Sequence, residues 1–239
     1  MLFRSEDEMR GKIMSKIGAL KMLCSHPELL TTSASKFTSM NGEGSSYAHE
    51  LVDSGALDGI TNSPKLDYLV QYIKEFLEQN ETNKVVVFAT YVDMLDKIEA
   101  ALGADICRKY SGKLDAKTKE ENKIAFNTDP AVRVLISSDA GGYGVDLPAA
   151  NLLINHDLPW SSGSATQRNG RIQRASSTWP SIVIQDIIIA GSIEERQWES
   201  LQHKSAVADA IIDGKGFDDK GGVPMSVESL RQFLTSSNV

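Results

Sequence analysis

The chain has 239 residues and a net charge of -7, with 41% hydrophobic and 24% charged residues. These proportions are typical of a globular protein that can bury a full core, and no apolar run reaches the roughly 18 residues of a membrane span. Because Cys24 and Cys107 are the only cysteines and no secretory signal opens the chain, we expect an intracellular protein without a disulfide framework or a four-ligand zinc site.

The N-terminal part is predicted to be helical and then irregular. Apolar residues recur at helical spacing over residues 1–30, and this pattern stops at His26-Pro27. Residues 31–62 are rich in Ser, Thr, Gly and Asn, which predicts a mobile loop or insertion. We therefore expect residues 1–62 to form an N-terminal helical segment that carries this insertion.

A strand–helix rhythm begins at Ser63, the expected N-cap of a helix that has Pro64 in its first turn. Apolar runs rich in β-branched residues predict strands at 84–90, 106–110, 133–138, 151–157 and 181–190. Further helices are expected at 91–102, 115–127 and 163–174, and again from Ser192. This alternation predicts an α/β fold with a parallel sheet covered on both faces. The expected domain spans residues 63–202, with a C-terminal helical extension at 203–239.

The segment TQRNGRIQR at 166–174 is the first candidate for chemistry. On a helix, Gln167, Arg171 and Arg174 would lie within about 60° of one another on one face. Guanidinium groups beside an amide suit anionic oxygens. Gly170 inside a helix costs about 1 kcal/mol relative to alanine, which suggests close approach of a ligand to the backbone. A solvated basic helix face is an equally good interpretation of this spacing.

The second candidate is SSDAGGYGVDL at 137–147, directly after a predicted strand. Its three glycines allow tight turns and close approach of a ligand to the backbone. In open parallel sheets the ligand lies at the edge where the strands end. A simple strand-to-loop turn is the alternative. The glycine spacing is not that of a dinucleotide-binding fingerprint.

Seven segments, taken in order, resemble the second RecA-like lobe of superfamily-two helicases, and within them the Swi/Snf-type remodelling translocases. The resemblance covers roughly residues 19–205 and consists of ALKMLCSHPELL (19–30), SPKLDYL (63–69), VVVFATYVDMLDKIE (85–99), YSGKLDAKTKEENKIAFNTDP (110–130), SSDAGGYGVDL (137–147), DLPWSSGSATQRNGRIQR (157–174) and GSIEERQ (191–197). The resemblance implies a RecA-like parallel sheet with helical extensions at both ends.

For the nucleotide, the resemblance assigns three sets of residues. Arg171 and Arg174 match the arginine fingers that reach across the cleft between two lobes to the γ-phosphate. Gln167 matches a motif VI glutamine that couples the nucleotide to the other lobe. Gly144 and Asp146 match motif V positions near the nucleotide, although most remodellers carry Asn at the second position.

For nucleic acid, the resemblance assigns contacts with the DNA backbone. Ser138 matches a hydroxyl that contacts phosphate, and Gly112, with Ser111 and Lys113 beside it, matches a second contacting turn. Such contacts are independent of base sequence and sensitive to salt. The expected partner is double-stranded DNA, with no membrane. The net charge of -7 argues weakly against DNA, but a local basic face decides such binding.

Several features depart from the family pattern. Residues 175–177 are Ala-Ser-Ser instead of a hydrophobic residue followed by Gly-Gln, and residues 88–90 are Phe-Ala-Thr instead of Phe-Ser-Gln. No phosphate-binding G-x-x-x-x-G-K-[ST] sequence is present. ATP, with its magnesium, is therefore expected to be held mainly by the N-terminal RecA-like lobe of the same protein, and this lobe alone should be inactive. A start at Met1 within family-like sequence favours a fragment over a separate partner chain.

The predicted function is the second motor lobe of an ATP-dependent translocase on double-stranded DNA, with no metal site of its own. One alternative is a standalone regulatory module that binds nucleic acid or protein without ATPase activity. Another is an ATPase of the same architecture that does not depend on nucleic acid. Stimulation of the intact ATPase by duplex DNA, single-stranded DNA or RNA would separate these functions.

Overall fold

The computed structural model describes residues 2–39, 44–139, 145–173, 176–177 and 179–212. The chain divides into two compact units. One unit consists of Met1–Asn62 together with Ile189–Val239, and the other is Ser63–Ile188. The sequence prediction places the second boundary at 202 instead. Each unit is described by itself.

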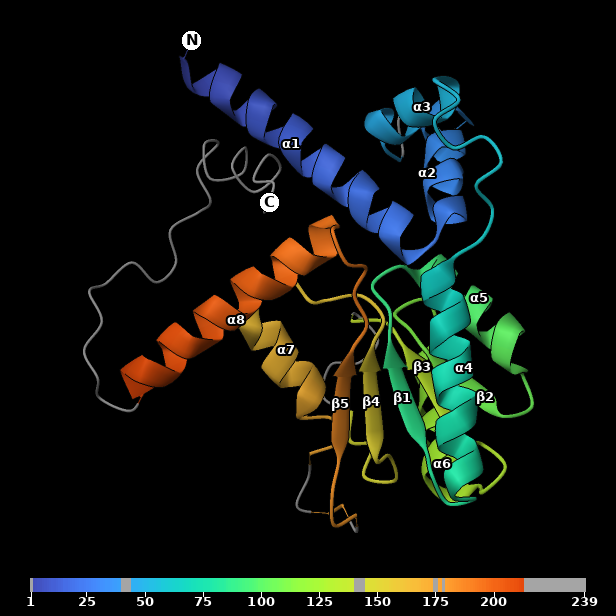
Figure 1. Ribbon diagram of the computed structural model, residues 1–239. Helices are drawn as coiled ribbons and strands as arrows, with labels where there is room; N and C mark the ends of the chain where they lie inside the picture. The colour runs from blue at the N-terminus through green and yellow to red at the C-terminus, as the bar shows by residue number, and fades with distance from the viewer. Residues whose placement is uncertain (1, 40–43, 140–144, 174–175, 178, 213–239) are drawn as a thin grey trace. The chain divides into compact units, whose positions relative to one another are not determined.

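The unit Ser63–Ile188 contains a five-stranded sheet of order β2-β3-β1-β4-β5, in which every pairing is parallel (Figure 1). The strands are β1 (Val85–Phe88), β2 (Cys107–Tyr110), β3 (Val134–Ser137), β4 (Leu152–Asn155) and β5 (Val183–Asp186). The strands begin and end level with one another. Their last residues form one row, Tyr110, Ser137, Phe88, Asn155 and Asp186. We call this end of the sheet the carboxyl edge.

Helices α4 (Pro64–Gln79), α5 (Val92–Leu102), α6 (Ala116–Thr128) and α7 (Ser162–Asn169) complete this unit. The Ser63 hydroxyl caps α4 by accepting a hydrogen bond from the Leu66 amide at 3.2 Å, as the Ser-Pro pair predicts. Strands β1, β3 and β4 are buried along their whole length, as expected of a sheet covered on both faces. The predicted α/β fold is therefore confirmed.

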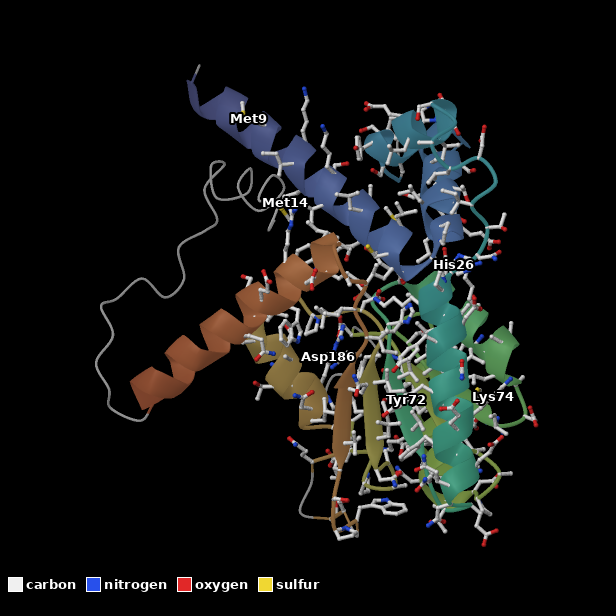
Figure 2. All side chains as sticks on the ribbon, viewed as in Figure 1. Met9, Met14, His26, Tyr72, Lys74 and Asp186 are labelled. Carbon is white, nitrogen blue, oxygen red and sulfur yellow. The ribbon has the colours of Figure 1, made fainter. Side chains whose placement is uncertain are left out.

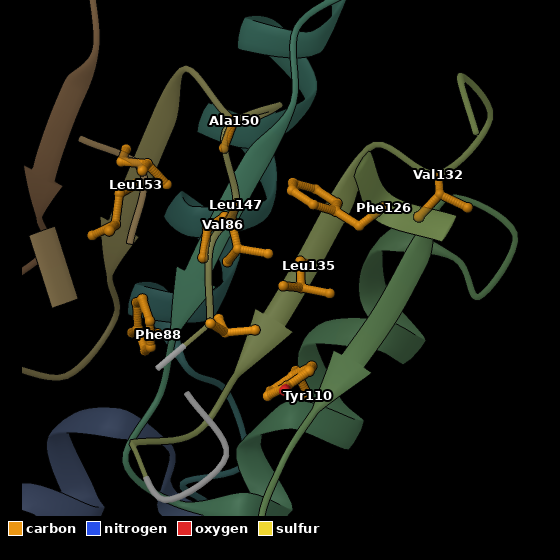
Figure 3. Close-up of a cluster of buried hydrophobic side chains, with 11 residues drawn as sticks. Val86, Phe88, Tyr110, Phe126, Val132, Leu135, Leu147, Ala150 and Leu153 are labelled. Atoms are coloured by element: carbon orange, nitrogen blue, oxygen red, sulfur yellow. The ribbon is translucent and has the colours of Figure 1, made fainter. Parts of the chain in front are cut away.

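The core on one face of the sheet is centred on Phe126 of α6 (Figure 3). Its ring belongs to one buried cluster with Val86 of β1, Leu135 of β3 and Leu153 of β4, together with Tyr110 and Val132. Alternate residues of the same strands point to the opposite face, and α5 packs against β2 and β3 there. The sheet is thereby held rigid beneath whatever binds at its carboxyl edge.

At the opposite end of the sheet, two cations bind helix C-termini. Lys84 Nζ donates to the carbonyl oxygens of Phe126 and Asp129, at 2.6 and 2.7 Å. Burial lowers the pKa of Lys84, and the nearby Asp129 partly opposes this effect. Arg133 donates to the carbonyls of Leu77 and Asn80 at 2.7 and 2.6 Å. Both side chains satisfy carbonyl groups that a helix end leaves without an intrahelical partner.

The helix predicted over 163–174 ends at Asn169, so the prediction is wrong beyond that residue. Gly170 is the C-cap, and its N–H donates to the Thr166 carbonyl at 2.9 Å. The next carbonyl, of Arg171, accepts from the Leu147 amide at 3.0 Å. The Arg171 amide donates to the Arg168 carbonyl at 3.0 Å, three residues back rather than four, so the α-helical hydrogen-bond pattern is broken at this turn. Gln167 and Arg171 therefore do not share a helix face.

The other unit is helical, with α1 (Leu2–Ser25), α2 (Pro27–Ser39), α3 (Ser46–Asp53) and α8 (Ile193–Ile212). The first helix ends just before His26-Pro27, as predicted. Met9 and Met14 are exposed on α1 (Figure 2). Within the part of the chain that the structure describes, none of the helices has the length and apolar character needed to cross a membrane.

The mobile loop predicted over residues 31–62 is wrong, because α2 and α3 occupy much of it. Small side chains explain the error. Ala34 of α2 and Ala48 of α3 are buried in a cluster with Ala19 and Leu30, so little apolar surface suffices for close helix packing. Of the predicted C-terminal extension at 203–239, α8 continues to Ile212, and residues 213–239 lie outside the described residues.

Candidate functional site

The carboxyl edge of the sheet brings together segments that are far apart in the sequence. Ser111 follows β2, Ser138 and Asp139 follow β3, and Asp157 lies just beyond β4. The Ser138 amide donates to the Tyr110 carbonyl at 3.1 Å, which joins the ends of β3 and β2. Helix α7 begins a few residues beyond β4, and the Ser161 hydroxyl caps it by accepting from the Ser164 amide at 3.1 Å.

Arg168 of α7 makes the densest set of polar contacts at this edge. Its Nε and Nη2 atoms donate to the two carboxylate oxygens of Asp139, at 2.6 and 2.7 Å. Its Nη1 atom donates to Asn155 Oδ1 at 3.0 Å and to the Asp157 carbonyl at 2.6 Å. The guanidinium also lies 5.3 Å from the centre of the Phe88 ring, which favours a cation–π contact. One buried arginine therefore contacts the ends of β1, β3 and β4.

A buried ion pair lies next to this arginine. Lys65 Nζ of α4 is 4.0 Å from Asp157 Oδ1, and both side chains are fully buried. The other oxygen of Asp157 accepts from the Thr90 amide at 2.9 Å. Such a pair is weak evidence for stability, since desolvation offsets much of the attraction. The Asp157 carboxylate thereby joins α4 to the segments that follow β1 and β4.

A small cavity of about 120 Å³ opens at the carboxyl edge. It brings together two predicted nucleotide-binding residues, Gln167 and Arg171. Gln167 is exposed, whereas Arg171 is 8% exposed. The lining also includes Phe88, Asp139, Pro159, Trp160, Ser164 and Arg168.

Of the other three residues predicted to act on the nucleotide, the structure describes only Asp146. Asp146 is exposed and its carbonyl accepts from Asn127 Nδ2 at 3.5 Å. Arg174 and Gly144 lie outside the described residues. Of the two predicted arginine fingers, the described structure therefore locates only Arg171.

The predicted DNA-contacting residues follow β2 and β3 at the carboxyl edge. Gly112 and Lys113 are exposed in the turn after β2, where the Leu114 amide donates to the Ser111 carbonyl at 3.2 Å. Lys113 Nζ lies 3.6 Å from Asp93 Oδ1, an exposed pair of little energetic weight. Ser111 and Ser138 are buried, so Gly112 and Lys113 present the more accessible surface.

Sequence reasoning missed Arg168 and Asp139. A helical stripe through 167, 171 and 174 leaves residue 168 about 100° away from residue 167, on a different face. The available signal was an arginine next to Gln167 and an aspartate two residues after the strand that ends in Ser137. Their pairing spans 29 residues of sequence, so spacing alone could not reveal it.

The described part of this edge suits anion binding more than metal binding. Arg171 and Gln167 supply N–H donors of the kind that bind phosphate oxygens. The Asp139 carboxylate is already paired with Arg168. Among the described residues, no group of three or more His, Cys, Asp or Glu side chains is arranged to hold a metal ion.

Comparison with known proteins agrees with this geometry. Residues 64–176 match the family described as helicase conserved C-terminal domain. The chain is 27% identical over 244 residues to the mouse DNA repair and recombination protein RAD54B, covering 92% of this chain and 26% of that protein. It is 28% identical over 225 residues to the human lymphoid-specific helicase, covering 91% and 24% respectively. The chain thus spans about a quarter of the length of these relatives.

Solved structures share the fold. The Sulfolobus solfataricus SWI2/SNF2 ATPase core in complex with dsDNA is 24% identical with a TM-score of 0.59, covering 90% of this chain and 42% of that chain. The C-terminal part of the Fun30 ATPase domain is 19% identical with a TM-score of 0.53, covering 74% and 66%. Residues 64–176 therefore form a helicase conserved C-terminal domain with a RecA-like fold. Over these residues the chain is similar to a helicase conserved C-terminal domain, and over 91–92% of its length to the curated relatives, which agrees with the predicted resemblance to the second lobe of Swi/Snf-type superfamily-two helicases.

Proposed function

We propose that this chain is the second motor lobe of an intracellular, ATP-dependent translocase on double-stranded DNA, with Arg171 and Arg174 as arginine fingers. The observation that carries the proposal is the position of Arg171 beside Gln167 in the cavity at the carboxyl edge. This is the edge where open parallel sheets bind ligands.

Phosphoryl transfer spreads negative charge over the oxygens of the transferred group, and a guanidinium placed there stabilises it. Arg171 is 8% exposed, and partial exclusion of water strengthens such an interaction. The charge of Arg168 is matched by Asp139, so that pair adds no net charge to the cavity. These features support Arg171 as the catalytic cation of this part of the lobe.

The nucleotide itself must be bound largely by another lobe. This chain lacks the phosphate-binding loop sequence, and its described residues offer no carboxylate cluster for magnesium. We therefore propose that an N-terminal RecA-like lobe of the same protein holds ATP and magnesium. Gln167 and Asp146, with Gly144, would complete the site from this side as the two lobes close.

Duplex DNA is the proposed track. The SWI2/SNF2 ATPase core to which this chain is similar in fold was solved in complex with dsDNA. On this chain, Gly112 and Lys113 are exposed beside the carboxyl edge, where a backbone N–H and an ammonium group can contact phosphate oxygens. Ser111 and Ser138, which follow β2 and β3 at the same edge, are proposed as further contacts of the DNA backbone. Opening and closing of the two lobes would then shift these contacts along the duplex.

The test compares Arg171→Ala with wild type in the full-length protein that contains both lobes. We expect at least about 10³-fold slower ATP turnover, because the transition-state charge loses its cation. Arg108→Ala is the matched control, since Arg108 on β2 donates only to nearby carbonyls, of Ala104 and Cys107. Near-normal turnover of the Arg171 variant would refute the finger assignment.

Duplex DNA, single-stranded DNA and RNA should each be added to the wild-type assay. We expect the largest stimulation with duplex DNA, and a stimulation that falls as salt increases. An ATPase rate that is the same with and without all three polymers would refute the translocase and indicate an ATPase independent of nucleic acid.

A further inference from the structure

We infer that Arg168 is a positioning residue that couples the segment after β3 to the turn that carries Arg171, through its two-point pair with Asp139. This inference rests on the proposed function, because the first segment contains a proposed DNA contact and the second a proposed arginine finger. Arg168 itself is not assigned contact with either ligand.

The geometry of the pair requires an arginine. Three nitrogens of one guanidinium make four hydrogen bonds, two to the Asp139 carboxylate and two to Asn155 and the Asp157 carbonyl. A lysine has one nitrogen and cannot reproduce a planar fork that also lies over the Phe88 ring. Replacement of Arg168 by lysine therefore keeps the charge and removes the fixed geometry.

The two ends of the pair lie next to the two proposed functional segments. Asp139 directly follows Ser138, the proposed DNA contact. Arg168 precedes Arg171 by three residues, and the Arg171 amide donates to the Arg168 carbonyl at 3.0 Å. A displacement of Asp139 therefore pulls on Arg168 and, through it, on the Arg171 turn.

A second connection links the same two segments. The Leu147 amide, on the far side of the segment that starts at Asp139, donates to the Arg171 carbonyl at 3.0 Å. The segment after β3 is thus tied to the Arg171 turn at both of its ends. This amide is a direct reporter of the position of the turn.

Burial makes the pair sensitive to loss of either member. Arg168 is 3% exposed, whereas the Asp139 side chain is 41% exposed. A buried guanidinium that loses its carboxylate is costly to keep in place, so removal of Asp139 should disturb Arg168 about as much as mutation of Arg168 itself. Changes that break one shared interaction are non-additive.

The kinetic test uses Arg168→Lys, Asp139→Asn and the double variant in the full-length protein. We expect each single change to lower kcat with duplex DNA about tenfold, equivalent to 1.4 kcal/mol, with little change in KM for ATP. The double variant should be no slower than the slower single variant. Arg133→Lys is the matched control, because it removes carbonyl contacts of a similar kind at the opposite end of the sheet. This control should leave kcat per folded molecule unchanged.

Amide hydrogen exchange on the 239-residue chain tests the pair without any ATPase activity. Arg168→Lys and Asp139→Asn should each speed exchange at Leu147, and Arg133→Lys should not. Two results would overturn the coupling. One is a double variant whose fold-loss in kcat equals the product of the two single losses. The other is a Leu147 amide that exchanges as slowly in both single variants as in wild type. A wild-type protein without DNA-stimulated ATPase would refute the proposed function instead, and Leu147 exchange would still decide whether the pair positions the turn.

Discussion

Replacement of Phe126 by alanine should be among the most damaging single changes in the unit Ser63–Ile188. The ring is fully buried in the core cluster on one face of the sheet. Loss of a buried phenylalanine side chain costs about 3–5 kcal/mol through lost burial and a residual cavity. The Lys84 ammonium, 5.4 Å from the ring centre, loses a further contact of about 0.5–1 kcal/mol.

A total near 4 kcal/mol is a large share of the roughly 5–15 kcal/mol that stabilises a domain. Because the free energy of unfolding falls by about 2 kcal/mol per molar urea, the midpoint of unfolding should fall by about 2 M urea. Tryptophan fluorescence is the assay. A Trp198→Phe background leaves Trp160 and Trp179, both in the unit Ser63–Ile188, as the reporters.

The matched control is Ile124→Ala, two positions earlier on α6, because Ile124 is 51% exposed. It should change stability by no more than about 0.5 kcal/mol. A Phe126→Ala midpoint within about 0.5 M of wild type, at unchanged slope, would refute the view that this ring centres the core.

Three other predictions are independent of this one. Burial, with help from Glu99, raises the pKa of Cys107 from 9.0 to about 12, so the unfolded thiol ionises first and stability should fall as pH rises above 9. The loss at pH 10 is about 1.4 kcal/mol, and a Cys107→Ala chain with the same alkaline decline in urea melts would contradict this. Ser63→Ala should cost about 1 kcal/mol by removing the cap of α4, whereas an unchanged urea midpoint would argue against the cap. The 239-residue chain alone should release no phosphate from ATP above the buffer rate, and measurable turnover would show that it binds and hydrolyses ATP without a second lobe.

The sheet could be predicted from sequence because its central strands are short runs with a strong physical signature. VVVF and VLIS are continuous apolar or β-branched stretches that suit burial on both faces. Local signals thus sufficed wherever burial alone decides the structure.

The errors arose where a distant contact decides the structure. Helix α7 ends at Asn169, and the turn that follows it pairs with Leu147 through the Arg171 carbonyl, a contact that the local sequence does not reveal. Helices α2 and α3 were missed because Ala34 and Ala48 pack closely while contributing little hydrophobicity. Arg168 was missed for the same reason as the end of α7, since its partner Asp139 is far away in sequence.

The level strand ends determine what kind of ligand the lobe can receive. Adjacent strands lie about 4.8 Å apart, so the row from Tyr110 to Asp186 extends about 19 Å. The turn after β2 that carries Lys113 and the cavity beside Arg171 therefore open from the same row. A ligand held at one of them would lie close to a ligand held at the other.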